Sequence, residues 1–152
     1  MPRATAEHRR LEALVGSWSG EETMHPSPWD SKGGTAKGRI ETRVGLDGFV
    51  VISDYVQERN GTISFRGHAV YSWDAGELCY LMYWFDSMSG APRGPARGTW
   101  EGDTLLFEDQ SPMGRSRYRY CFDEADSYGF AIEHRQDGEN WMTFMDARYQ
   151  RD

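Results

Sequence analysis

The sequence predicts an all-β fold: a single antiparallel up-and-down β-barrel of about ten strands, preceded by a short N-terminal helix. Turn-forming Asx-Gly pairs recur along the chain, and such pairs favour the positive φ angles of tight hairpins. Aromatic residues make up 14% of the 152 residues and glycines number 17, a composition that favours strands joined by turns over helices. Hairpins without helical crossovers form an antiparallel sheet, and closing that sheet into a barrel removes its exposed edges.

The first segment predicts both the helix and a closed end of the barrel. A short amphipathic turn at Leu11–Val15 runs directly into Gly16-Ser17-Trp18-Ser19-Gly20. A flat Trp side chain can cover one end of a small barrel, while the flanking glycines let neighbouring backbones approach closely. We therefore expect Trp18 to lie at the closed end, beside the helix.

Turn residues divide the rest of the chain into strands. The clearest turns are Asp47-Gly48, Asn60-Gly61 and Asp137-Gly138. Together with the loops between them, these turns predict strands at 17–25, 34–46, 49–59, 62–73, 78–86, 95–101, 104–110, 115–123, 128–136 and 141–150.

The alternation of polar and apolar side chains supports several of these strands, and two strands lack it. Charged residues alternate with smaller, apolar or aromatic ones over 37–44 and over 115–120, as in strands with one solvated face. In contrast, Phe49–Ile52 and Leu78–Phe85 are apolar at both parities. We expect their outer faces to be covered by the N-terminal helix or by a partner subunit.

The lengths of the connections give the barrel two different ends. Short turns near 47–48, 74–77, 101–103 and 124–127 fall at the end that Trp18 occupies. The longer segments 26–33, 87–94 and 111–114 fall at the opposite end. Binding groups are commonly carried on loops above a rigid scaffold, so we expect this second end to be the mouth of a binding site.

Composition limits the classes of partner. At this length the chain suits one domain, residues 1–152. Its net charge of −7 disfavours nucleic acid, which requires a basic face. No stretch approaches the ~18 consecutive apolar residues of a membrane span. The first residues lack the apolar core of a signal peptide, and Cys79 and Cys121 fall on separate predicted strands, so we expect free thiols in a cytoplasmic protein.

Motifs for catalysis or metal binding are absent from the sequence. It contains no Cys-x-x-Cys, His-x-His or His-Glu-x-x-His spacing, and no Gly-x-Ser-x-Gly, P-loop or Gly-x-Gly-x-x-Gly motif. An acid/base pair inside the barrel stays open as an alternative, but no residue set demands one. We therefore expect a binding protein without a metal site rather than an enzyme.

The aromatic residues are the strongest functional signal, because they favour a pocket for a small hydrophobic or amphipathic molecule. We expect this ligand to place its apolar body inside the barrel and its polar head at the mouth. The predicted walls are Trp29, Trp84, Tyr118, Phe130 and Trp141, and the predicted polar anchors are Asp86, Arg117 and His134.

Each part of that hypothesis has a structural alternative. The same rings can simply fill the barrel, which leaves no cavity and makes the protein an interaction module that forms a homodimer through its doubly apolar strands. Asp86 can pair with a cation such as Arg117, or it can cap the loop 87–94 by accepting backbone hydrogen bonds.

Several segments together resemble a known bacterial family, domain-of-unknown-function family 1579. The resemblance implies a calycin-like barrel, related to lipocalins, fatty-acid-binding proteins and nitrobindins, and it implies no activity. The matching segments are Leu14-Val15-Gly16-Ser17-Trp18-Ser19-Gly20, Leu46-Asp47-Gly48-Phe49, Gly67-His68-Ala69-Val70-Tyr71-Ser72-Trp73-Asp74, Trp84-Phe85-Asp86-Ser87 and Gly98-Thr99-Trp100-Glu101-Gly102-Asp103.

The similarity to the haem-binding nitrobindins is looser and rests on Gly16-Ser17-Trp18-Ser19-Gly20. Nitrobindins continue this glycine motif by one step, where the present chain has Glu22. They hold the haem iron with a histidine on their last strands, and His134 is the only histidine in that region here. A haem protein with His134 as the axial ligand is therefore the alternative that this resemblance implies.

Overall fold

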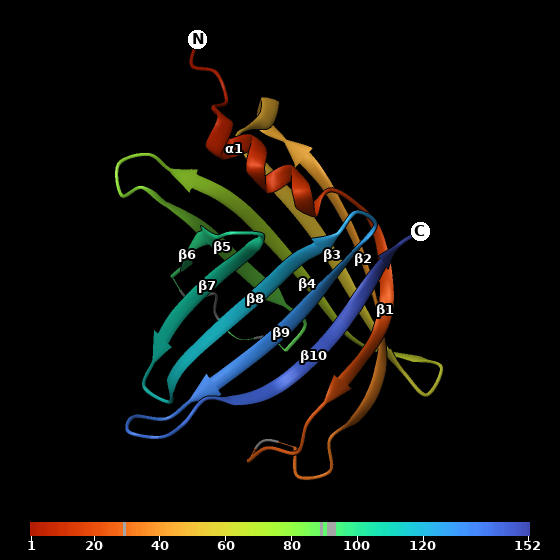
Figure 1. Ribbon diagram of the computed structural model, residues 1–152. Coiled ribbons are helices and arrows are strands. Elements are labelled where there is room, and N and C mark those ends of the chain that lie inside the picture. The colour runs from red at the N-terminus through yellow and green to blue at the C-terminus, as the bar shows by residue number, and fades with distance from the viewer. Residues whose placement is uncertain (29, 89, 91–93) are drawn as a thin grey trace.

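Ten antiparallel strands close into one barrel in the computed structural model, which describes residues 1–28, 30–88, 90 and 94–152 (Figure 1). Neighbours around the barrel follow the chain order, and β10 pairs with β1 to close the ring. The strands are β1 (Gly16–Met24), β2 (Gly34–Gly45), β3 (Val50–Arg59), β4 (Thr62–Asp74), β5 (Cys79–Asp86), β6 (Ala96–Glu101), β7 (Thr104–Ser111), β8 (Gly114–Glu124), β9 (Ser127–Arg135) and β10 (Met142–Arg151).

The predicted barrel, its strands and its turns are confirmed. Every strand begins and ends within one residue of the predicted range. The Asx-Gly turns have the expected backbone, with φ of 52° at Asn60, 78° at Gly61 and 79° at Gly138. A tight antiparallel turn fixes the register of the strands it joins, so these local signals specify most of the sheet.

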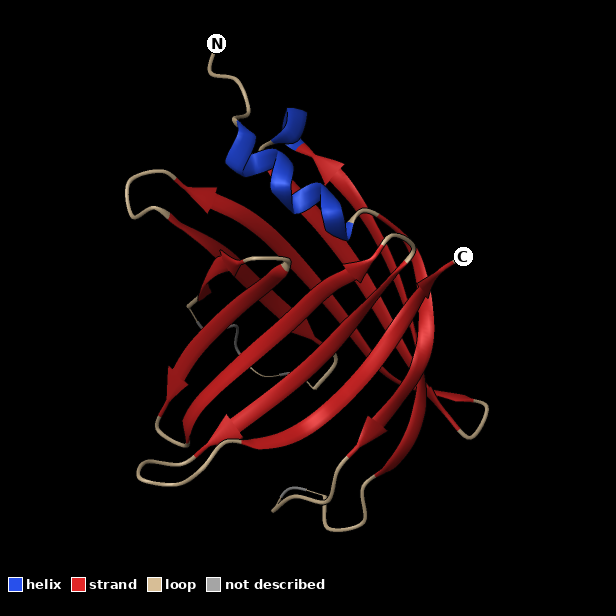
Figure 2. Ribbon diagram, viewed as in Figure 1, coloured by secondary structure: helices blue, strands red, loops and turns tan. Residues whose placement is uncertain are grey.

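A helical segment closes one end of the barrel, which we call the helix end (Figure 2). It consists of α1 (Ala6–Arg10) and the 3-10 turn η1 (Leu11–Leu14). Leu11 and Leu14 are buried, and the indole Nε1 of Trp18 donates to the Leu14 carbonyl oxygen at 2.9 Å. Trp18 is 1% exposed, and it occupies the closed end as predicted.

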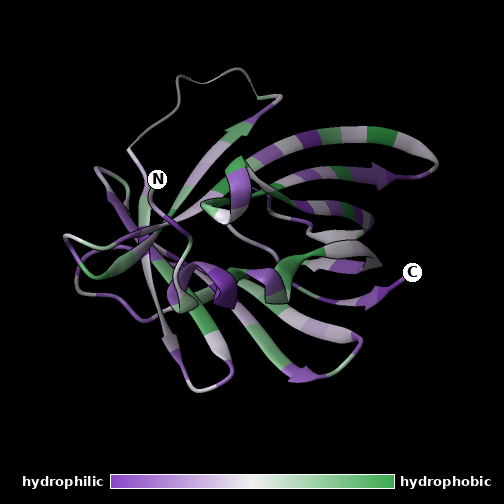
Figure 3. Ribbon diagram, turned by 90° about the horizontal axis from the view of Figure 1, so that it is seen from above, coloured by the Kyte–Doolittle hydropathy of each residue, from purple (hydrophilic) through white to green (hydrophobic). Residues whose placement is uncertain are grey.

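Large side chains fill the half of the interior nearest the helix end. Seen from above, hydrophobic and hydrophilic residues alternate along several of the strands (Figure 3). The inward aromatic rings meet one another, as in the Trp18–Tyr128 contact at 4.8 Å, and the hydroxyls of Tyr71 and Tyr120 share a buried hydrogen bond of 2.8 Å. The other buried members of this core include Val51, Ala69, Tyr80, Met82, Ala96, Leu105, Phe107 and Tyr149. In this half of the barrel the filled-interior alternative is correct.

The helical segment does not cover the outer face of β5. It packs over the helix end instead, where the Tyr80 hydroxyl donates to the Glu7 carbonyl oxygen at 2.8 Å. Tyr83 and Phe85 point outward from β5 and are 38% and 45% exposed. The sequence analysis expected either the N-terminal helix or a partner subunit to cover the outer face of this strand. The helix does not cover it.

The interior tyrosines predict a loss of stability at alkaline pH. Burial raises the pKa of Tyr71 from 10.0 to about 12, and burial also raises the pKa of Tyr120 and Tyr128. Above pH 10 the unfolded chain releases these protons while the folded protein retains them. The free energy of unfolding should therefore be unaffected below pH 10 and fall as pH rises from 10 toward 12, by up to about 1.4 kcal/mol per pH unit for each such tyrosine.

Urea unfolding at a series of pH values, with absorbance at 295 nm to follow tyrosinate, measures this effect. Ionisation of all the tyrosines near pH 10, with the β-sheet circular dichroism intact, would contradict the packing described above.

Candidate functional site

Three aromatic rings line one inner wall of the barrel towards the end opposite the helix, which we call the mouth. Tyr55, Phe65 and Trp84 come from β3, β4 and β5 and form the mouth aromatic cluster. The rings of Phe65 and Trp84 are stacked, with centroids 6.3 Å apart and an angle of 15° between their planes, and Tyr55 lies 6.0 Å from Phe65. Gly67 makes this arrangement possible, because a Cβ atom there would lie 2.2 Å from the Trp84 ring.

The exposure of Trp84 distinguishes the mouth from the filled half of the barrel. Trp84 is 37% exposed although it shares the inward face with Ala69, its cross-strand partner, which is 1% exposed. Nearer the helix end, the inward residues Met82 and Tyr80 of the same strand are buried. An aromatic surface inside the barrel is therefore left open to solvent at the mouth.

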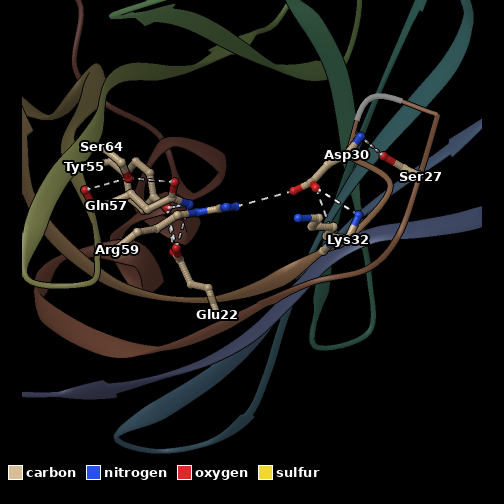
Figure 4. A network of polar contacts seen from close by, with 9 residues as sticks. Glu22, Ser27, Asp30, Lys32, Tyr55, Gln57, Arg59 and Ser64 are labelled. Carbon is tan, nitrogen blue, oxygen red and sulfur yellow. Dashed lines mark hydrogen bonds and ion pairs between the residues drawn. The ribbon is translucent and has the colours of Figure 1, made fainter.

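A buried carboxylate lies beside the mouth aromatic cluster, on β1 (Figure 4). Glu22 is 0% exposed. The Tyr55 hydroxyl lies 2.7 and 2.6 Å from its two oxygens, the Gln57 amide donates to it at 3.0 Å, and the Tyr149 hydroxyl donates at 2.5 Å. Gly38 gives the carboxylate room, since a Cβ there would lie 2.2 Å from Oε2 of Glu22.

The two tyrosines of this network act as hydrogen-bond donors. Burial, and then the neighbouring Glu22 carboxylate, raises the pKa of both Tyr55 and Tyr149. Both phenols therefore keep their protons at neutral pH and present them to the carboxylate. An ionised carboxylate accepts hydrogen bonds only, so a ring of donors is the arrangement that satisfies it.

Glu22 is a site residue that the sequence analysis missed. The relevant signal was present: Trp18, Gly20 and Glu22 share one parity of β1, and Trp18 was expected to cover the closed end of the barrel. Its donors lie 33, 35 and 127 residues away in the chain, so no local pattern indicates that they are available.

Two of the predicted wall residues face inward on the far side of the barrel. Tyr118 is opposite the core residue Phe107 in the β7–β8 register, and Phe130 is opposite Tyr120 in the β8–β9 register. Tyr118 and Phe130 are half-buried and pack on the hydrophobic core. The structure therefore places these two with Trp84 on the inner surface.

His134 lies on the same inner register at the rim of the mouth, opposite Ser116. Its Nδ1 is 3.1 Å from the Ser116 hydroxyl and its Nε2 is 3.1 Å from the Met113 carbonyl oxygen. A haem iron requires an imidazole nitrogen that is not otherwise bonded. Because both nitrogens of His134 are engaged, this residue does not fit the ligation of haem as it stands, and we assign it no haem chemistry.

Asp86 caps the loop that follows β5. One of its carboxylate oxygens accepts the backbone N–H of Met88 at 2.9 Å, and the other accepts the Trp84 indole N–H at 2.8 Å. The second contact fixes the Trp84 ring at the mouth. Asp86 therefore orients the Trp84 ring and caps the loop, the structural role considered from the sequence. It does not pair with Arg117, whose partner is Glu133.

Arg117 and Trp141 lie on the outer surface and not with the inward set. Arg117 alternates with the inward Tyr118, and it donates to the two oxygens of Glu133 at 2.9 and 3.0 Å. The Trp141 ring covers its guanidinium at 4.0 Å. Trp29, the remaining predicted wall residue, lies outside the described residues.

Two of the depressions on the surface of the described part of the chain bear on the site. One, of about 210 Å³, lies at the rim of the mouth beside His134, between Pro28 and Phe144. The other, of about 690 Å³, is an open groove along the outside of β6 and β7, lined by Arg97 and Glu108 among others. Of these two, the first adjoins the mouth, and the second is separate from the inner aromatic surface.

The described residues contain no group of three or more His, Cys, Asp or Glu side chains that could hold a metal ion. Cys79 and Cys121 are free thiols. Among the helices of the described part, none is long and apolar enough to cross a membrane.

Comparisons with known proteins identify a family and a shared fold. A family model described as "Protein of unknown function (DUF1579)" matches residues 3–151. The crystal structure of Rv2717c from M. tuberculosis has a TM-score of 0.71 at 13% identity, with 97% of this chain and 98% of that chain covered. The S-type phycobiliprotein lyase CPES from Guillardia theta has a TM-score of 0.68 at 13% identity, with 97% and 93% covered. No curated protein matches the chain.

The Glu22 network predicts a stability defect that its exposed neighbour does not share. In Glu22→Gln, an amide N–H group replaces one acceptor oxygen and faces the donors Tyr55, Gln57 and Tyr149. The free energy of unfolding should fall by about 1–3 kcal/mol. Glu21→Gln is the matched control, because Glu21 is exposed on the outer face, and it should change stability by less than ~0.5 kcal/mol. Urea unfolding compares the two variants, and equal stabilities would show that the network is not stabilising.

Proposed function

The chain belongs to the DUF1579 family of proteins of unknown function, and we propose that it binds a small hydrophobic or amphipathic molecule at the mouth of its barrel. The observation that carries the proposal is the 37% exposure of Trp84 on the inward face of β5. Large aromatic side chains release a favourable free energy when a ligand covers them, which makes an open inner aromatic wall a binding surface. We propose binding without catalysis.

The filled half of the barrel limits where such a ligand can lie. Buried core side chains such as Trp18 and Tyr149 fill the interior at the helix end. The body of the ligand therefore contacts the mouth aromatic cluster and the inward rings of Tyr118 and Phe130. His134 and Asp86 lie at the rim. Each Asp86 oxygen can accept a further hydrogen bond from a polar head, directly or through water, whereas His134 would first have to release Ser116 or Met113. The proposed site therefore comprises an apolar wall with polar groups at its opening.

The structural relatives support this proposal only through their shape. A barrel with this fold is named a phycobiliprotein lyase in Guillardia theta. At 13% identity the likeness extends to the fold, so the argument for ligand binding rests on the exposed inner surface of the present chain.

A second candidate function is an interaction module that pairs with another copy of this chain. The specific observation in its favour is the outer face of β5, where Tyr83 and Phe85 are 38% and 45% exposed. Light scattering after size-exclusion chromatography tests it: a dimer that Phe85→Ser converts to a monomer supports this function, and a monomer at every concentration removes it.

We also propose that the protein works in a reducing compartment such as the cytoplasm. Both cysteines are free and lie on separate strands, a pattern typical of proteins kept reduced.

Substitution of Trp84 tests the binding site. N-phenyl-1-naphthylamine, an uncharged aromatic probe whose fluorescence rises in apolar surroundings, should bind the natural protein, and Trp84→Ala should weaken its binding about tenfold or more. Phe85→Ala is the matched control, since Phe85 is the next residue on β5 but faces outward. Fluorescence titration gives the affinities, and thermal unfolding checks that both variants fold. Equal affinities in the natural protein and Trp84→Ala would exclude the proposed wall.

A further inference from the structure

Arg59 is a cation at the mouth, on the wall that carries the mouth aromatic cluster. It ends β3, two residues after Gln57, and its side chain extends from the Glu22 network toward Asp30 (Figure 4). Asp30 belongs to the segment that joins β1 to β2 above the mouth. The two side chains are 35% and 33% exposed, so the pair is accessible from solvent.

Among the described residues, the guanidinium of Arg59 forms one ion pair, and that pair is long. Its Nη2 lies 3.9 Å from Oδ2 of Asp30, which exceeds hydrogen-bond distance. Among the described residues no hydrogen bond to this guanidinium is recorded, although the group carries five N–H donors. Arg117 provides the contrast, because it donates to both oxygens of Glu133 on the outer surface.

Asp30 is held in place by its other oxygen. Oδ1 accepts the backbone N–H of Lys32 at 3.3 Å and that of Gly33 at 3.1 Å, which closes a turn in the segment. Oδ2 faces Arg59 without reaching hydrogen-bond distance. Asp30 therefore balances the charge of Arg59 while leaving its donors available.

We infer that the ligand of this mouth is an amphipathic anion, whose carboxylate, sulfonate or phosphate head binds Arg59 while its apolar body lies on Tyr55, Phe65 and Trp84. The inference rests on the proposed function and adds the chemical class of the ligand. A planar guanidinium binds such heads through two parallel hydrogen bonds, and its partial burial strengthens them. Asp30 competes with the ligand for Arg59, so only an anion that also gains apolar contact displaces it.

Two fluorescent probes that share an aromatic body separate this inference from the proposed function. 1-Anilinonaphthalene-8-sulfonate carries an anionic head, and N-phenyl-1-naphthylamine is the same body without it. The natural protein should bind the anionic probe more tightly, and this preference should shrink at high salt, which screens the head group.

Variants of the pair should move the affinity for the anion in opposite directions. Arg59→Gln should weaken binding of the sulfonate about tenfold or more and leave the uncharged probe unaffected. Asp30→Asn keeps an oxygen for the backbone of Lys32 and Gly33 but removes the competing charge, so the sulfonate should bind about two- to fivefold more tightly. Arg43→Gln is the control, an exposed arginine on β2 beside Asp54, and it should change neither affinity.

The outcomes are distinguishable. Weaker binding of both probes in Arg59→Gln, or weaker binding of the sulfonate in Asp30→Asn, would assign the pair a structural role and overturn the inference. Binding of the uncharged probe with no preference for the sulfonate would overturn the inference alone. Failure of the natural protein to bind either probe would overturn the proposed function as well.

Discussion

The hydrogen-bonded carboxylate of Glu22 is the constraint on which the closed barrel depends. It lies on β1, and its donors lie on β3 and on β10, the strand that closes the ring. A buried carboxylate without hydrogen bonds is costly, so each donor must be in place. A shift of one residue in any of these strands would turn its hydrogen-bonding side chain to the other face of the sheet. The network therefore selects one register across the seam between the first and last strands.

The same network lies at the boundary between two different interiors. On the helix side, Trp18, Tyr128 and Phe107 fill the barrel as a close-packed core. On the mouth side, the rings of Tyr55 and Trp84 have solvent beside them. Rigid packing on one side and an open aromatic surface on the other would give the proposed ligand a wall that is fixed before it arrives, which would reduce the entropy lost on binding.

The fold could be predicted because its signals are local. Asn60-Gly61 and Asp137-Gly138 specify their turns without help from the rest of the chain, and the parity around Trp18 indicates the inward face of β1. The candidate site could be predicted from the sequence only in part. Trp84, Tyr118 and Phe130, chosen from the sequence as wall residues, lie on the inward face, and so does His134, whose direction the sequence left open. Arg117 alternates with Tyr118 along β8 and faces outward. Glu22 and Arg59 were missed because a buried carboxylate and an accessible cation are recognised only by what surrounds them, and their surroundings come from distant strands.

The pairing of β1 with β10 also determines how long the edge of β1 stays unpaired during synthesis. Tyr149 follows Glu22 by 127 residues, so at ~5–20 residues per second the ribosome needs roughly 6–25 seconds between them. Throughout that interval the outer edge of β1 has unpaired N–H and C=O groups, which another chain can pair with. The nascent protein therefore keeps this open edge until β10 pairs with β1, and that pairing removes both edges of the sheet at once.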